Sequence, residues 1–135
     1  MIDKNSSNPN PDFKTGEVIL IDKEVGWTSF DVVNSLRYFL NKQYGLKKLK
    51  VGHAGTLDPL ATGLVIVCTG KKTKEIESYQ AQEKEYTGSF YLGKTTPSFD
   101  LETEPDRDFP IDHIDEELII VSTKKFTGII EQEPP

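Results

Sequence analysis

The 135-residue sequence has one cysteine, two histidines and no long hydrophobic run. The single cysteine, Cys68, cannot form a disulfide within the chain, and its place inside an apolar run favours packing over catalysis. The longest apolar runs, residues 64–68 and 118–121, are far shorter than the roughly 20 residues that a membrane-spanning helix needs. We therefore expect no membrane span.

Signals for metal and cofactor sites are weak. His53 and His113 lie far apart in the sequence, which argues against a zinc site. Asp58 has no acidic neighbour, so that paired-carboxylate chemistry and an oxygen-rich metal site both lack partners nearby. The glycines around it are not followed by the Gly-Lys-Ser/Thr ending of a phosphate-binding P-loop. We expect neither a metal nor a cofactor.

Residues 1–15 are rich in Asn, Pro, Ser and Lys and have no apolar core. This composition predicts a disordered leader rather than a signal peptide, and a cytoplasmic location follows as the default. The whole chain, with 36% hydrophobic and 28% charged residues, is typical of a globular protein and has the length of one domain.

The net charge of −6 hides two regions of opposite sign. Residues 37–74 contain eight bases and one acid, Asp58, for a net charge of +7, whereas residues 100–135 contain 11 acids and three bases, for −8. A basic field of this kind can bind a polyanion through its phosphates, and it can equally be a solvated, lysine-rich surface. Three of its members are candidate phosphate contacts on charge alone: Lys47, Lys48 and Lys50.

Apolar runs and helical spacing alternate along the chain, which predicts a mixed α and β fold. Strands are expected at residues 17–22, 64–68, 86–92 and 127–132. Residues 94–110 are polar, acidic and contain proline, which predicts a mobile connection or an insertion. Three helices are expected: from Thr28 or Ser29 to Gly45, near residues 73–81, and from Asp112 or Asp115 to about residue 125.

The stretch GHAGTLDPLATG, residues 52–63, places Asp58 in a nearly neutral segment framed by glycines. An Asp followed by Pro59 can cap a single helical turn, which is a purely structural role. Alternatively, Pro59 biases Asp58 toward extended backbone angles and so holds its carboxylate in one direction. An ionised carboxylate can attack a sugar's anomeric carbon or an electrophilic pyrimidine ring. The residue types alone leave both roles open.

Two more side chains have a structural and a functional interpretation. His53 can be a hydrogen-bonding group of the fold or a contact for a ligand. Tyr86 can be a core aromatic or a face on which an extruded base stacks. A known arrangement that uses Asp58, His53 and Tyr86 together would favour the functional interpretation of all three.

Four segments, in order, resemble the TruB family of pseudouridine synthases. Residues 52–63 closely resemble the family signature, in which this Asp is the catalytic residue. Residues 22–33, DKEVGWTSFDVV, resemble its Asp-Lys-Pro-x-Gly-x-Thr-Ser stretch, with Glu24 in place of the usual Pro. Residues 84–93, KEYTGSFYLG, are similar to its Lys-x-Tyr strand, and residues 126–135, FTGIIEQEPP, to its Phe-x-Gly-x-Ile-x-Gln-x-Pro-Pro segment.

The resemblance covers about residues 16–135 and implies an α+β fold, with a mainly antiparallel sheet, flanking helices and only part of the catalytic domain present. It implies isomerisation of uridine 55 in the T loop of tRNA to pseudouridine, without a cofactor, a metal or an obligate protein partner. By resemblance, Asp58 attacks C1′ of the ribose or C6 of the uracil, and Tyr86 stacks on the flipped-out ring. His53 is expected to contact the target nucleotide or to help hold the flipped arrangement.

Family members continue with a Tyr-Ser-Ala-x-Lys segment, a later basic residue that pairs with the catalytic Asp, further strands and usually an RNA-binding domain. This sequence contains none of them, so we expect the 135-residue piece itself to be inactive or nearly so. The alternatives are a non-catalytic RNA-binding or RNA-folding module and a guide-RNA-dependent synthase subunit. The motif DPLATG is more similar to the bacterial stand-alone tRNA enzymes than to guide-dependent relatives.

Overall fold

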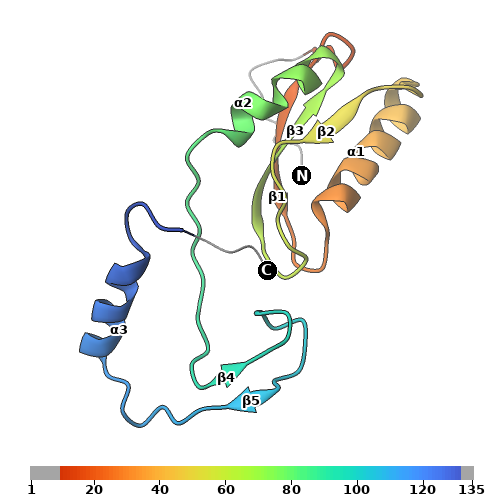
Figure 1. Ribbon diagram of the computed structural model, residues 1–135. Helices are drawn as coiled ribbons and strands as arrows, with labels where there is room; N and C mark the ends of the chain where they lie inside the picture. Colours follow the sequence, from red (N-terminus) through yellow and green to blue (C-terminus); the bar gives the residue numbers. More distant parts are fainter. Residues whose placement is uncertain (1–9, 132–135) are drawn as a thin grey trace. The chain divides into compact units, whose positions relative to one another are not determined.

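The computed structural model describes residues 10–131 and divides into two compact units, with the boundary in the chain between residues 86 and 87. The first unit contains β1 (Val18–Lys23), α1 (Ser29–Tyr44), β2 (Val51–His53), β3 (Gly63–Thr69), the 3-10 helix η1 (Gly70–Glu75) and α2 (Ile76–Gln80) (Figure 1). The second contains β4 (Lys94–Thr95), β5 (Arg107–Asp108), α3 (Glu116–Thr123) and the 3-10 helix η2 (Lys124–Phe126). Helices and antiparallel sheets occur together, which confirms the predicted α+β class.

The sheet of the first unit has the order β1-β3-β2, and all its pairs are antiparallel. On one side of β3, Lys23 at the end of β1 pairs with Gly63. On the other side, His53 at the end of β2 pairs with Val67. This register places the connection between β2 and β3, residues 54–62, at the end of the sheet where β1 also ends. The Asp58 motif occupies that connection.

The longest helix, α1, has the ends that its sequence predicts. The Asp31 amide donates to the Thr28 hydroxyl at 3.0 Å, and the Thr28 amide donates to the Asp31 carboxylate at 2.9 Å, which together form a capping box. The Thr28 hydroxyl also donates to this carboxylate, and these bonds lower the pKa of Asp31. Gly45 ends the helix in the left-handed region, at φ 67°, where glycine carries no steric penalty.

The core lies between α1 and one face of the sheet (Figure 1). Alternation along β3 points Val65 and Val67 toward the helix and leaves Leu64 exposed on the other face. The buried core side chains are Phe13, Val32, Val33, Leu36, Leu40, Val51, Val65 and Val67.

One of these core residues, Phe13, comes from the predicted leader. Its side chain is 7% exposed, and its ring centroid lies 5.4 Å from that of Tyr44. Asp12 also takes part in local structure, because it accepts hydrogen bonds from the side chain and the amide of Thr15. The prediction of a disordered leader through residue 15 is therefore wrong for residues 10–15, since burial of one aromatic ring anchors the segment. Residues 1–9 lie outside the described residues.

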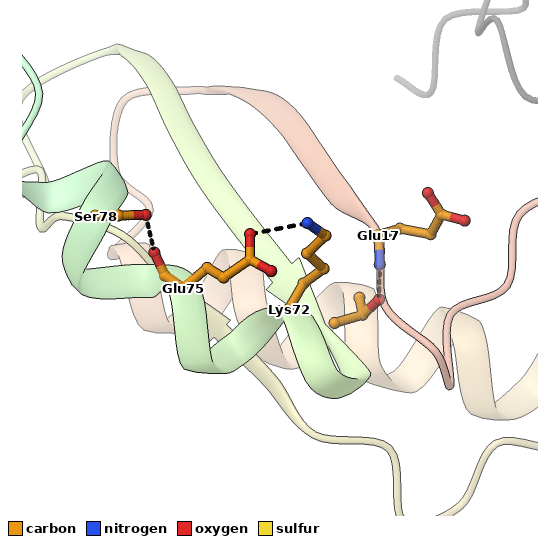
Figure 2. Close-up of polar contacts among 5 residues, drawn as sticks. Glu17, Lys72, Glu75 and Ser78 are labelled. Atoms are coloured by element: carbon orange, nitrogen blue, oxygen red, sulfur yellow. Dashed lines mark hydrogen bonds and ion pairs between the residues drawn. The ribbon is translucent and has the colours of Figure 1, made fainter.

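One polar contact connects the start of β1 to the end of β3, and two others lie within η1 and between η1 and α2 (Figure 2). The Glu17 amide donates to the Thr69 hydroxyl at 2.9 Å, and Lys72 forms an ion pair with Glu75 at 2.8 Å. The Ser78 hydroxyl donates to the Glu75 carbonyl at 2.7 Å. The helix expected near residues 73–81 thus forms as η1 followed by α2. Cys68, in β3, is fully buried, which fits a packing role, and this burial raises the pKa of its thiol.

Two predicted strands are not formed. Residues 86–92 contain no strand, and Phe90 in this segment is 94% exposed. Residues 127–131 also contain no strand, and residue 132 lies outside the described residues. Aromatic and β-branched residues favour a strand only where another strand satisfies the backbone groups. Neither segment has such a pairing partner among residues 10–131.

The rest of the second unit contains one short strand pair and the predicted helix. Residues 94–110, predicted to be a mobile connection or an insertion, contain the pair β4–β5, across which Lys94 contacts Asp108 at 3.2 Å. Asp115 caps α3 by accepting the Leu118 amide at 2.8 Å, as one of the two predicted caps. Among residues 10–131, no helix has the length and apolar composition needed to cross a membrane.

Candidate active site

Asp58 lies in an exposed turn between β2 and β3. The Ala61 amide donates to the Asp58 carbonyl at 3.0 Å and closes a four-residue turn with Pro59 in its second position. Proline suits this position because its ring fixes φ near the required value. Residues 58–62 contain no helix, so the alternative that Asp58 caps a helical turn is wrong. Among the described residues, no side chain or amide forms a hydrogen bond or ion pair with its carboxylate.

The residues on both sides of Asp58 are tied to the connection between β1 and α1. The Leu57 amide donates to the Ser29 hydroxyl at 2.9 Å, and this hydroxyl lies 3.4 Å from the Leu57 carbonyl, to which it donates. The Gly26 amide donates to the Pro59 carbonyl at 2.7 Å. The Asp58 backbone is therefore held before and after the residue, although its side chain is free to meet a ligand.

The β1–α1 connection is itself held by a buried lysine. Lys23 is 1% exposed, and its Nζ donates to the Trp27 carbonyl at 2.6 Å and to the Glu24 carbonyl at 3.2 Å. Glu24 stands where the family usually has Pro, and it contributes only a backbone carbonyl, which Pro also has. Gly26, at φ 82°, completes the loop in a conformation that favours glycine. Sequence reasoning missed Lys23, Gly26 and Ser29 as site residues, although they lie in the stretch that resembles a family motif.

His53 is half-buried at the end of β2. Its Nδ1 lies 2.7 Å from the Gly55 carbonyl oxygen. A carbonyl only accepts hydrogen bonds, so Nδ1 carries a proton in this contact. This bond fixes the ring against the start of the motif and leaves Nε2 for a contact with a ligand.

Tyr86 and the motif line one hollow of about 260 Å³. Its floor is formed by Leu64 and Ile66, on the face of the sheet opposite α1. Residues 54–57, the run between His53 and Asp58, form one wall, and residues 82–86 form another. Tyr86 is 71% exposed, which excludes the core role that its residue type allowed. The structure thus brings Tyr86 beside the segment that carries His53 and Asp58.

The three candidate lysines lie elsewhere. Lys47, Lys48 and Lys50 are exposed and, with Lys14, line a second hollow of about 450 Å³. The Lys50 carbonyl accepts the Gly70 amide at 2.9 Å, at the far end of β3 from Gly63. A seven-residue strand such as β3 spans about 20 Å. The three lysines therefore lie together on one surface, but that surface is at the other end of the sheet from Asp58.

Comparisons with known proteins identify the family of this chain. Residues 41–135 match the TruB family pseudouridylate synthase N-terminal domain. Proteins called tRNA pseudouridine synthase B are 58% identical over 125 residues in Flavobacterium johnsoniae and 57% identical over 123 residues in Phocaeicola vulgatus. These matches cover 92% and 91% of this chain but 55% and 52% of the relatives, so the chain spans about half the length of the curated relatives it matches. The chain belongs to the TruB family of pseudouridylate synthases.

Proposed function

We propose that this chain is part of a bacterial enzyme that converts uridine in tRNA to pseudouridine, and that its target is uridine 55 of the T loop. The observation that carries the proposal is the tethered, exposed turn of Asp58, which directly follows residues 54–57, and these residues line a hollow together with Tyr86. Relatives called tRNA pseudouridine synthase B supply the substrate class. A cytoplasmic location and the absence of a cofactor and of an obligate protein partner stay predictions.

In the proposed reaction the Asp58 carboxylate is the nucleophile, and it attacks either C1′ of the ribose or C6 of the uracil. The N1–C1′ bond breaks, the uracil turns within the site, and C5 forms the new bond to C1′, while the bond between Asp58 and the nucleotide breaks and returns the free carboxylate. C5 loses its proton and N1 gains one, so that the product is an isomer of the substrate. The exposed turn suits this role because a polynucleotide must bring its flipped nucleotide to the carboxylate.

The hollow that residues 54–57 and Tyr86 line suits one flipped base. Its volume of about 260 Å³ lies below the range of about 300 to 1,000 Å³ that is usual for drug-sized ligands. The face of the Tyr86 ring is available for stacking, since most of its surface is exposed. We assign His53, through Nε2, a contact with the target nucleotide or with the backbone that holds it flipped.

Replacing Tyr86 with Ala is expected to slow pseudouridine formation by about 10- to 100-fold, because one base–aromatic stack is worth about 1–3 kcal/mol. Tyr86→Phe keeps the ring face and is expected to stay within about threefold of the parent rate. Single-turnover rates with a T stem-loop RNA measure both, in a protein that joins residues 1–135 to the remaining C-terminal residues of the Flavobacterium johnsoniae relative. If the two variants are equally slow, the hydroxyl rather than the ring face is the important group.

The lysine hollow is proposed to contact RNA phosphates away from the target nucleotide. Replacing Lys47, Lys48 and Lys50 together with Gln is expected to reduce the slope of log affinity against log salt by about 2 to 3, at roughly 0.7 to 0.9 for each contact. The rate at saturating RNA should not change. Lys124 and Lys125, within the acidic region, provide the control: their replacement with Gln should leave the slope unchanged, and an equal effect would contradict a local contact.

The 135-residue chain on its own is proposed to be inactive or nearly so. Catalysis of this kind gains from fixed charges around the reacting groups, and no cation contacts the Asp58 carboxylate within residues 10–131. The chain also spans about half the length of its relatives. A longer polypeptide is therefore needed to test the reaction.

The test uses an extended chain, in which residues 1–135 are joined to the remaining C-terminal residues of the Flavobacterium johnsoniae relative. With a T stem-loop RNA, the extended chain should form pseudouridine at uridine 55, and the 135-residue chain should form little or none. Turnover by the short chain at the same rate would contradict its proposed inactivity. Binding of the RNA without any pseudouridine would favour the RNA-binding module, and activity only with a guide-RNA particle would favour the guide-dependent alternative.

A further inference from the structure

The place from which the Asp58 side chain projects depends on contacts made by its neighbours. No contact within residues 10–131 engages the carboxylate, so the backbone of residues 57–59 sets the direction of the Cα–Cβ bond and with it the space that the carboxylate can reach. Ser29 holds Leu57 through both backbone groups, as donor and as acceptor. Two hydrogen bonds to one residue fix the orientation of its peptide groups more tightly than one bond can.

The Ser29 hydroxyl is itself well anchored. Ser29 is the first residue of α1, next to the capping box of Thr28 and Asp31, and it is 1% exposed. The same helix places Val33 and Leu36 in the core against the sheet. Because the Ser29 backbone belongs to α1, the two hydrogen bonds of its hydroxyl tie the Leu57 backbone to a helix that packs on the core.

We propose that Ser29 is a positioning residue for Asp58, acting through the backbone of Leu57. The inference rests on the proposed function, because it assumes that the Asp58 carboxylate reacts with the nucleotide. Errors of about 1 Å in the placement of a reacting group can cost about 100-fold in rate. Loss of the hydroxyl therefore lowers the rate of the chemical step, while the RNA, which contacts other surfaces, still binds.

The expected results for the extended chain separate positioning from a merely structural role. Ser29→Ala lowers the single-turnover rate by about 10- to 100-fold, with the dissociation constant for RNA and the KM within about twofold of the parent. Ser29→Thr retains a hydroxyl and restores most of the rate. The matched control is Ser35→Ala, the same change at an exposed position of α1, and it leaves the rate unchanged.

Three results would overturn the proposal: a parental rate for Ser29→Ala, a loss of RNA affinity in place of rate, or a rate loss fully explained by the fraction of unfolded protein. If Ser29→Ala does not fold, Ser29→Cys is the second variant, because a thiol fills nearly the same space but is only a weak donor and acceptor. A Ser29→Cys protein that reacts at the parental rate would also overturn the proposal. Asp58→Asn distinguishes a failure of the proposed function from a failure of the positioning role of Ser29. If that variant stays active, the proposed nucleophile fails; if it is inactive while Ser29→Ala is fully active, only the positioning role fails.

Discussion

Asp58→Asn is expected to lower pseudouridine formation by the extended chain by at least about 1,000-fold, because an amide of the same shape is no nucleophile and carries no negative charge. The fold should survive the change. The carboxylate is exposed and bonds to nothing within residues 10–131, and surface changes of this kind alter the free energy of unfolding by about 0.5 kcal/mol or less. Single-turnover assays at saturating enzyme measure the rate, and thermal unfolding checks the fold.

The control for this substitution is Asp112→Asn, the same change at an exposed position in the second unit, which should keep the parental rate. RNA affinity of the Asp58→Asn variant should stay within about threefold of the parent, because phosphate contacts supply most of the affinity. A variant that keeps even a tenth of the rate would move the nucleophile to another residue. Parallel losses of rate and affinity would instead give Asp58 a role in holding the RNA.

The features that sequence predicted well depend on contacts between near neighbours. Thr28 and Gly45 mark the two ends of α1, because a cap and a left-handed glycine act within one helical turn. Pro59 likewise fixes the Asp58 turn within four residues. The role of Asp58 does not follow from such local contacts. Its residue type leaves a structural and a catalytic role open, and only the family resemblance favours the catalytic one.

The features that sequence missed depend on partners far along the chain. Phe13 is a single aromatic residue in a polar stretch, so no periodicity marks it as a core residue. The contact between Ser29 and Leu57 spans 28 residues, and neither local sequence signals it. Residues 86–92 have strand-forming side chains but no partner strand among the described residues, and propensity alone does not form a ladder.

Among the substitutions considered, Gly70→Ala is expected to lower the free energy of unfolding the most, because the segment that carries Phe13 passes directly against Gly70. A Cβ at Gly70 would lie 2.6 Å from the Phe13 carbonyl oxygen and would also overlap the Lys14 carbonyl. Gly70 has φ 53°, where a side chain adds about 1–2 kcal/mol. If the segment must leave, the loss of the Phe13 ring from the core adds the cost of a Phe→Ala change, about 3–5 kcal/mol.

Gly45→Ala separates the backbone strain from the collision. Gly45 has φ 67°, in the same left-handed region, but a Cβ there meets nothing within 4 Å. Urea denaturation of the 135-residue chain should therefore show a loss of about 1–2 kcal/mol for Gly45→Ala, and at least about 3 kcal/mol more for Gly70→Ala. Displacement of the segment should also make residues 10–15 sensitive to limited proteolysis in the Gly70 variant alone. Equal losses for the two variants would mean that the N-terminal segment contributes little to the core, in conflict with the burial of Phe13.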